Sequence, residues 1–362
     1  AMLADHVQLT FFEDFIRAGE AYFDRTGRWI VFQATPQPAE GAEPTPHYEM
    51  YVARVKRDAF GRIIGLDTPI QVSEPGSANT CGWFHPHEPG VVLFGSTMTP
   101  PSEEARSGYS RDRSRYTWQF PEETEMVTRT VRAMVDDMVT DPDQRQRLLS
   151  RPDVDRAVPM FRRPGYDAEG SWSPDGRTVL YCNVNPETGD GDLYIHVVGT
   201  DEHRPIVTAR GYDGGPFFSP DGRWICYRSD RRGDNLLQIF IAELTFDEDG
   251  LPDGIAREIQ LTDEQHVNWA PYWSRPDGRH LVFASSEVSH RNYEVVAIGV
   301  HPTRPGPGPT RRITFTEGFD GLPVFTFDGR WMMWTAQRGS DRGADGRASS
   351  QIWAAPVAGQ PF

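Results

Sequence analysis

Short apolar segments recur along the whole chain, and tight polar turns separate them in pairs. The clearest example runs from Gly211 to Asp230, where the segments GPFF and RWICYRS flank the turn SPDG. Apolar runs of this length, bounded by Gly, Pro and Asp, are typical of β-strands. Related stretches begin at Arg17, Asn79, Gly165, His266 and Gly318. The pattern therefore predicts a protein built from many short strands.

The turn glycine of each pair marks a repeat. Successive turn glycines lie 46 to 86 residues apart, at Gly27, Gly90, Gly176, Gly222, Gly278 and Gly329. After each turn come a second strand, a variable loop, a third strand such as LQIFIAEL, and a fourth such as EIQL. Repeats of about 40–60 residues made of strands are typical of propeller blades. We therefore predict an all-β, six-bladed β-propeller with four-stranded blades.

The two ends of the chain are expected to meet in the sixth blade. The last unit ends after its third strand, whereas the initial stretch HVQLTFFEDF resembles the fourth-strand stretches EIQLTDEQH and RRITFTEGF. A strand at residues 7–10 would close the ring and remove an exposed sheet edge. We expect one domain over residues 1–362, with blades at approximately 17–73, 79–162, 165–208, 211–262, 266–315 and 318–357 plus strand 7–10.

The second unit contains an insertion at residues 98–150. Its apolar residues follow helical spacing at Val127, Val131, Met134, Val135 and Met138. Asp141 and Pro142 then have the residue types that begin a second short helix. The pattern predicts a helical insertion over about 127–150, either between the third and fourth strands or in place of part of the third. Its apolar stripe is expected to pack on its own blade, with a partner-binding helix as the alternative.

Composition narrows the class of partner. The net charge of −15 disfavours binding to a nucleic-acid backbone. No apolar run approaches the roughly 20 residues of a membrane span, and the first ten residues lack the features of an export signal. The three cysteines make no disulfide framework. Cys182 and Cys226 are expected to be buried thiols, and Cys81 to lie at the surface or in the channel.

The wording of the repeats resembles a known family. The stretches WSPDGR, FFSPDGRWI and YRSDRRG are similar to the WD40-like PD40 repeats of TolB-like six-bladed propellers, over nearly the whole chain. The resemblance implies a propeller that is periplasmic or secreted and used for protein contacts, with a cytoplasmic location as the alternative. Similar repeats also form the scaffold of oligogalacturonate lyases, so fold alone leaves function open.

Five of the six units place an Asp or Asn three residues before a Pro or Gly of the first strand. In a propeller these positions lie at one mouth of the central channel, and the SPDG turns lie at the other end. A ring of oxygens at one mouth would suit a hard cation such as Ca²⁺. The alternative is that each side chain satisfies backbone groups nearby. The candidate metal ligands are Asn79, Asp167, Asp213, Asn268 and Asp320.

Other polar residues are predicted at the same mouth. Candidate ligand-binding residues are Arg17, Glu20, Glu169, Trp118 and Arg291. Trp118 would supply an exposed ring for a sugar or a partner. Three loop histidines, His47, His266 and His290, are candidate metal ligands or acid–base groups, although a lone loop histidine is usually only solvated. The sequence contains no GxSxG, P-loop or GxGxxG motif.

The leading hypothesis is a monomeric, non-enzymatic binding or scaffold protein. Its working face would be the channel mouth, overhung by residues 98–115 and the helical insertion. The ligand would be a protein partner, a small molecule or a carbohydrate, with Ca²⁺ in the channel as a further expectation. One alternative is a metal-dependent polysaccharide lyase or hydrolase acting at the same face, and another is a purely structural module.

Overall fold

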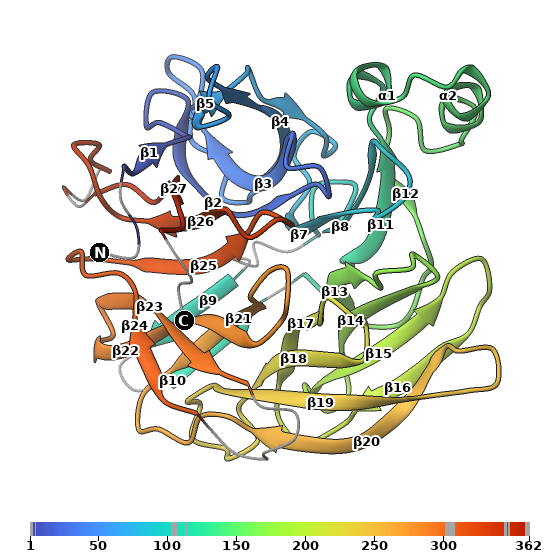
Figure 1. The fold of residues 1–362 in the computed structure, drawn as a ribbon, viewed down its shortest axis with the longest axis vertical. Helices are drawn as coiled ribbons and strands as arrows, with labels where there is room; N and C mark the ends of the chain where they lie inside the picture. Colours follow the sequence, from blue (N-terminus) through green and yellow to red (C-terminus); the bar gives the residue numbers. More distant parts are fainter. Residues whose placement is uncertain are drawn as a thin grey trace.

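A computed structural model of the chain shows six antiparallel sheets arranged around a central axis (Figure 1). The structure describes residues 3, 5–102, 108–112, 115–119, 121–300, 308–343, 346 and 348–358, and for 108–112 and 115–119 it describes the backbone alone. Each sheet is one blade, with its first strand beside the axis. The predicted all-β six-bladed propeller is confirmed.

The strands follow the predicted order within each blade. Blade 1 contains β2 (Phe15–Phe23), β3 (Trp29–Pro36) and β4 (Glu49–Arg57), and β5 (Ile63–Leu66) and β6 (Ile70–Gln71) share its outer position. Blade 2 contains β7 (Asn79–Phe84), β8 (Val91–Ser96), β11 (Glu125–Thr130) and β12 (Val158–Pro159). Blade 3 contains β13 (Tyr166–Trp172), β14 (Thr178–Val184), β15 (Gly191–Val197) and β16 (His203–Val207).

The second half of the ring has the same organisation. Blade 4 contains β17 (Asp213–Phe218), β18 (Trp224–Ser229), β19 (Gln238–Phe246) and β20 (Pro252–Gln260). Blade 5 contains β21 (Asn268–Trp273), β22 (His280–Ser289), β23 (Asn292–Gly299) and β24 (Thr310–Arg312). Blade 6 contains β25 (Asp320–Phe325), β26 (Trp331–Ala336), β27 (Gln351–Pro356) and the N-terminal β1 (Val7–Gln8).

The SPDG turn between the first two strands has a local cause. In blade 4, Oδ1 of Asp221 accepts hydrogen bonds from the Ser219 hydroxyl at 2.5 Å and from the Arg223 backbone N–H at 3.1 Å. Gly222 has a φ of 71°, which glycine adopts without steric cost. The Asp of this motif therefore stabilises the turn, away from the channel mouth.

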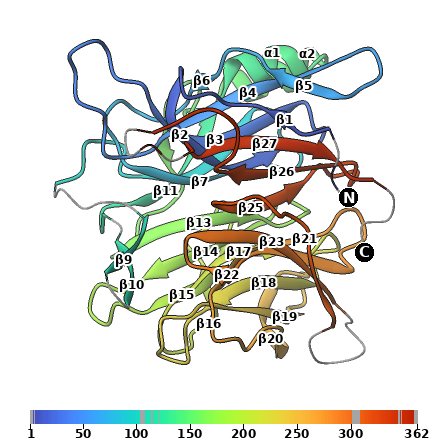
Figure 2. The ribbon, with the colours of Figure 1, turned by 90° about the vertical axis from the view of Figure 1, so that its left-hand side faces the viewer.

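Strand β1 closes the ring as predicted. Val7 pairs with Ala354 of β27, and the two strands lie side by side in Figure 2. Beyond the strand, Leu9 N–H donates to the Ile352 carbonyl at 2.8 Å, and Ile352 N–H donates to the Thr10 hydroxyl at 2.9 Å. The outer edge of β27 is thereby covered by the other end of the chain.

Blade 2 contains two insertions, whereas the sequence predicted a single one. A hairpin of β9 (Gly108–Asp112) and β10 (Arg115–Gln119) lies between β8 and β11, and helices α1 (Arg132–Met138) and α2 (Pro142–Leu149) lie between β11 and β12. The predicted helical start was wrong, because Val127 pairs with Phe94 as part of β11. A short apolar run fits a buried strand as well as a helix, so the spacing did not separate the two.

The helices pack on their own blade at its A–B turn, where the first two strands meet. Val135 and Leu148 form a small apolar cluster with Val91, and Val131 N–H donates to the carbonyl of the turn residue Gly90 at 2.8 Å. The turns lie at the end of the ring opposite the channel mouth. The expectation that the helices overhang the mouth was therefore wrong, because β11 runs away from the mouth and ends beside the A–B turn.

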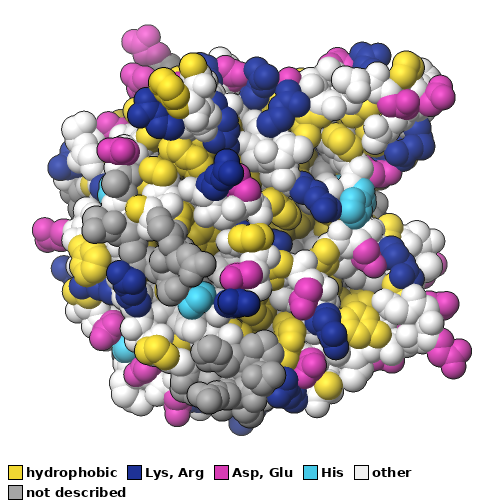
Figure 3. All heavy atoms as spheres, in the orientation of Figure 1, with side chains coloured by type: hydrophobic (Ala, Val, Ile, Leu, Met, Phe, Trp, Pro, Cys, Tyr) yellow, Lys and Arg dark blue, Asp and Glu magenta, His cyan; other side chains and the backbone are white. Residues whose placement is uncertain are grey.

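The helical pair also contacts blade 1. The Asp137 carboxylate accepts hydrogen bonds from the Arg28 guanidinium and from the Trp29 indole, both at 2.9 Å. Figure 3 shows the pair projecting from the ring, with Lys and Arg side chains intermingled with Asp and Glu on this face. Among the described residues, no helix has the length and apolar character that crossing a membrane requires.

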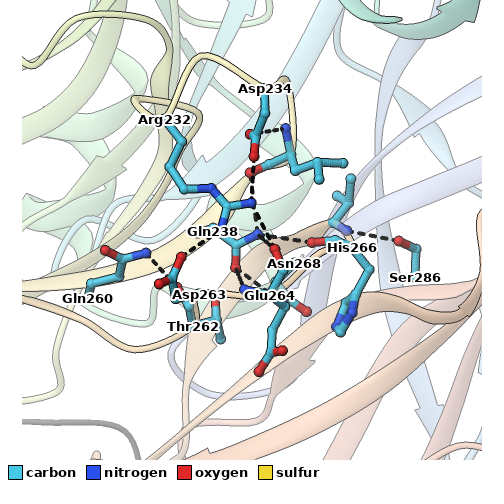
Figure 4. A network of polar contacts seen from close by, with 12 residues as sticks. Arg232, Asp234, Gln238, Gln260, Thr262, Asp263, Glu264, His266, Asn268 and Ser286 are labelled. Atoms are coloured by element: carbon cyan, nitrogen blue, oxygen red, sulfur yellow. Dashed lines mark hydrogen bonds and ion pairs between the residues drawn. The ribbon is translucent and has the colours of Figure 1, made fainter. Parts of the chain in front are cut away.

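Neighbouring blades are joined where the first strand of one meets the start of the third strand of the blade before it. Asn268 N–H donates to the Leu237 carbonyl at 2.9 Å. The Gln238 amide adds further bonds, because its nitrogen donates to the His266 carbonyl at 2.9 Å and its oxygen accepts from Glu264 N–H at 3.1 Å (Figure 4). Polar side chains at this position therefore hold adjacent blades together.

The Asp or Asn near the start of the first strand, present in five of the six blades, is buried and bonded within the protein. Asp167 accepts from the Asn183 amide at 2.8 Å, and Asp320 accepts from the Arg338 guanidinium at 2.8 Å. The five residues have exposed fractions of 2% or less: Asn79, Asp167, Asp213, Asn268 and Asp320. Burial raises the pKa of Asp167 to about 7 and that of Asp213 to about 6. These side chains therefore carry much of the polar bonding of the blades.

Because residues 7–10 close the ring, we predict that truncating the Leu9 side chain destabilises the protein. The Leu9 side chain is 4% exposed, so Leu9→Ala should lower the free energy of unfolding by about 2–5 kcal/mol. Phe11 is nearby and 41% exposed, so Phe11→Ala should change it by no more than about 0.5 kcal/mol. Urea unfolding measures both. Equal effects of the two substitutions would show that residues 7–10 do not close the ring.

Because the pKa of Asp167 is raised, we predict that Asp167→Asn increases the free energy of unfolding at high pH but not at low pH. With its pKa raised to about 7, the folded carboxyl keeps its proton up to about pH 7, whereas the unfolded carboxyl loses its proton near pH 3.8. Wild-type stability should therefore fall as pH rises through this window. The Asn variant should be more stable than wild type by about 2–4 kcal/mol at pH 8 and equally stable near pH 3.

Urea unfolding at pH 3, 6 and 8 tests this prediction. The matched control is Asp175→Asn at an A–B turn, where the side chain is 52% exposed and the pH dependence should match that of wild type. A constant difference between Asp167→Asn and wild type across the three pH values would contradict the burial argument.

Candidate functional site

The first strand of every blade contains the same β-bulge, which faces the central axis. Its first residue has a left-handed backbone, with φ of 47° at Glu20, 54° at Cys81, 58° at Glu169, 59° at Gly215, 53° at Ala270 and 54° at Leu322. Left-handed backbone costs a residue other than glycine roughly 1–2 kcal/mol. The repetition shows that the bulge belongs to the blade architecture. The side chains that it presents differ, and half of the ring is polar.

A buried ion pair occupies one side of this layer. Glu169 Oε1 accepts from the Arg228 guanidinium of β18 at 2.6 Å, and Glu169 Oε2 accepts from Gly215 N–H at 2.6 Å. Both charged residues are 6% exposed. A Cβ at Gly215 would lie 2.0 Å from Arg228 Nη1, so the glycine makes room for the arginine. Although burial acts in the opposite direction, Glu169 raises the pKa of Arg228, which stays charged.

A second carboxyl, that of Glu20, lies in the same layer with neutral donors. The Tyr22 hydroxyl donates to Glu20 Oε1 at 3.3 Å, and the Cys81 thiol is a further hydrogen-bonding neighbour. Burial raises the pKa of Glu20; Glu169 adds to this increase and Arg228 opposes it. Burial also raises the pKa of the Cys81 thiol, so this cysteine is protonated and a poor nucleophile.

Aromatic rings close the channel beneath the charged layer. Trp83 packs against Tyr22 with centroids 4.9 Å apart and against Phe217 at 5.2 Å, and Phe217 packs against Tyr272 at 5.3 Å. A cavity of about 20 Å³ remains between these rings and the charged layer. That volume accommodates one group of the size of a water molecule.

On the other side of the layer, the channel widens into a cavity of about 980 Å³. We call it the mouth cavity. Its floor includes Glu20, Cys81, Glu169, Arg228 and Leu322. Its walls include the basic residues Arg17, Arg291, Arg338 and Arg342 and the aromatic residues Tyr48, Trp269, Tyr293 and Phe319. Because aromatic rings block the channel below the floor, the mouth cavity is a blind pocket.

Most predicted ligand-binding residues lie on this cavity. Arg17, Glu20, Glu169 and Arg291 line it, and the Arg17 guanidinium stacks on the Tyr48 ring at 4.3 Å. The side chain of Trp118 lies outside the described residues, although its backbone is part of β10.

The three candidate histidines are not brought together. His290 lines the mouth cavity, whereas His47 is buried and His266 offers its backbone carbonyl to Gln238. Burial lowers the pKa of His47, and the neighbouring Arg17 lowers it further. A joint acid–base or metal role for these residues stays a prediction without shared geometry.

The five predicted metal ligands do not face one shared site. Of the five, Asn79 lines the mouth cavity, and its amide oxygen accepts from the Ser96 hydroxyl at 2.6 Å. Asp167, Asp213 and Asp320 accept hydrogen bonds from residues of their own blades, whereas the Asn268 amide donates to Gln238 of the neighbouring blade at 3.3 Å. In the part of the chain that the structure describes, no group of three or more His, Cys, Asp or Glu side chains could hold a metal ion. The calcium site stays a prediction.

Sequence reasoning missed Arg228. The equivalent second-strand residues of the other blades are Gln33, Gly95, Cys182, Ala284 and Thr335. Arg228 alone is charged in this set, and it lies opposite the pair Gly214–Gly215. The available signal was a charge in a buried strand, close to Gly215, where every other blade carries a side chain.

Comparisons with known proteins agree on the fold. No protein-family model and no curated protein matches the sequence. TolB from Acinetobacter baumannii has a TM-score of 0.54 at 17% identity; the match covers 92% of this chain and 65% of that one, just under two thirds of its length. A putative TolB from Agrobacterium tumefaciens has a TM-score of 0.51 at 16% identity, covering 94% and 90% of the two chains.

A third structure matches over nearly its whole length. A protein of unknown function from Dyadobacter fermentans has a TM-score of 0.55 at 11% identity, and the match covers 98% of each chain. At these identities the likeness concerns the fold. Six blades in closed order and these structural matches together show that the chain has the TolB-like six-bladed propeller fold.

Proposed function

We propose that the protein is a non-enzymatic binding protein that takes a small ligand, or a segment of a partner protein, into the mouth cavity. The observation that supports this most is the blind cavity of about 980 Å³. Pockets for small ligands are concave and usually measure about 300–1,000 Å³. A cavity at the upper end of this range accepts a ligand of several groups or a short peptide segment.

The chemistry of the walls supports a mixed polar and planar ligand. The protein has a net charge of −15, yet four arginines line the walls of this cavity. Arg291 is exposed at the rim, where its charge attracts an acidic group. Trp269, Tyr293 and Phe319 form an aromatic cluster with centroids 5.7 to 6.5 Å apart, which offers faces for stacking.

The enzymatic alternative has less support. A metal-dependent lyase or hydrolase needs a set of ligands and an acid–base group in one place. The three candidate histidines are dispersed, and the Cys81 thiol is protonated. The likeness to TolB structures favours a periplasmic or secreted location and a role in protein contacts. Monomeric state, Ca²⁺ binding and carbohydrate binding remain proposals of the same kind.

Two charge-reversal variants, one in the mouth cavity and one on the opposite face, test the cavity as the binding surface. A library of small acidic, aromatic and peptide ligands is screened by thermal shift, and hits are measured by calorimetry. Arg291→Glu should weaken binding of acidic hits at least about tenfold. The control is Arg279→Glu at an A–B turn on the opposite face, where the side chain is 79% exposed and affinity should be unchanged. Hits that bind Arg291→Glu as well as wild type would contradict the proposal.

A further inference from the structure

The floor of the mouth cavity has an unequal number of opposite charges. Glu169 is buried and Glu20 partly buried, and the two carboxyl groups line one cavity with a single cation, Arg228. Glu169 uses both of its oxygens on Arg228 and on Gly215 N–H. Among the described residues, the side-chain hydrogen-bonding neighbours of the Glu20 carboxyl are the Tyr22 phenol and the Cys81 thiol. A partly buried carboxylate is stabilised by a nearby cation, and this layer has two carboxyl groups for one guanidinium.

The space beside Glu20 is small. Glu20, Cys81, Glu169 and Arg228 line both the mouth cavity and the cavity of about 20 Å³ below it, so the two meet at this layer. The small cavity accommodates one group of the size of a water molecule. A primary ammonium group has that size and three donors, whereas a guanidinium or a quaternary ammonium is larger.

We propose that the channel floor binds a primary ammonium group of the ligand, which enters from the mouth cavity and pairs with Glu20. This inference rests on the proposed binding function and adds a chemical class to it. The ligand is then an amine with an extended body, such as a peptide amino terminus or a lysine-like chain. Its amine reaches the floor while the rest of the molecule lies against the arginines and aromatic rings of the walls.

The layer also explains why the amine would be selected over other cations. The Arg228 guanidinium already fills the space above Gly215 and lies 5.7 Å from the Tyr212 ring centroid and 5.8 Å from that of Trp269. Glu20, Tyr22 and Cys81 line the small cavity that remains. The Glu20 oxygens accept hydrogen bonds from an ammonium there, and the Tyr22 hydroxyl oxygen adds a further acceptor.

The competing explanation needs no ligand. Burial favours the neutral form of Glu20, and a proton held by this carboxyl would balance the layer by itself. The two explanations differ in pH dependence. If Glu20 pairs with an ammonium, amine binding releases the Glu20 proton, and affinity falls as the pH is lowered.

Calorimetry with simple amines tests the inference on the intact protein at pH 8 and constant ionic strength. The probes are n-butylammonium, n-butanol and tetramethylammonium. Wild type should bind n-butylammonium at one site and the other two probes at least about tenfold more weakly, because one lacks the charge and the other exceeds the small cavity. Affinity for n-butylammonium should be lower at pH 5 than at pH 8.

Two matched variants locate the interaction. Glu20→Gln should weaken n-butylammonium binding at least about tenfold. It should be no less stable than wild type in a thermal melt, since it removes a partly buried ionisable carboxyl. Glu317→Gln makes the same change at an exposed carboxylate of the same cavity and should alter affinity by less than about twofold.

Each outcome bears on the inference. No n-butylammonium binding by wild type, or equal binding by Glu20→Gln, would overturn it. The proposed function is tested separately: non-amine ligands that lose affinity on Arg291→Glu would support the mouth cavity as a binding surface while the ammonium site fails. If neither amines nor Arg291-dependent ligands bind, both proposals are wrong.

Discussion

Close packing of six β-bulges around one axis is the constraint on which the rest of the structure depends. The second bulge residue of each first strand lies against the preceding blade, where little space remains. A Cβ at Gly82 would lie 2.5 Å from Val31, and one at Gly170 would lie 2.4 Å from Met126. Small residues and prolines at this position allow the blades to meet, and they turn the preceding side chain toward the axis. The geometry of the ring therefore determines which residues form the floor.

At the floor of the mouth cavity the backbone geometry repeats in all six blades, but the side chains differ. Three blades place Glu20, Cys81 and Glu169 there, while the opposite three place glycine, alanine and leucine. The resulting asymmetry leaves space for Arg228, which reaches across to Glu169. Buried charges must be paired to be tolerated, so the layer combines one complete ion pair with a carboxyl that needs either a proton or a cation. This need connects the architecture of the blades to the proposed amine site.

The predictions from sequence succeeded for features that residues close together in the sequence determine. The SPDG turns form because Asp and Gly satisfy the turn geometry, and the closing strand was recognisable because it resembles other outer strands. Glu20 and Glu169 were expected near the channel because they follow the start of the first strand, and both line the mouth cavity. The helical start failed because Val127 fits a strand and a helix equally well, and burial in β11 decided between them.

By itself the sequence determined the number of blades, their strand order, the ring closure and the residues that make the turns, because each depends on a pattern within one repeat. Only the tertiary structure decided which polar residues share a cavity. Asp167 and Asp320 satisfy partners within their own blades, and Arg228 pairs with a residue of the neighbouring blade. The reason is physical: strand twist and bulge geometry set the direction of each side chain around a common axis, and contacts between blades have no fixed spacing along the chain.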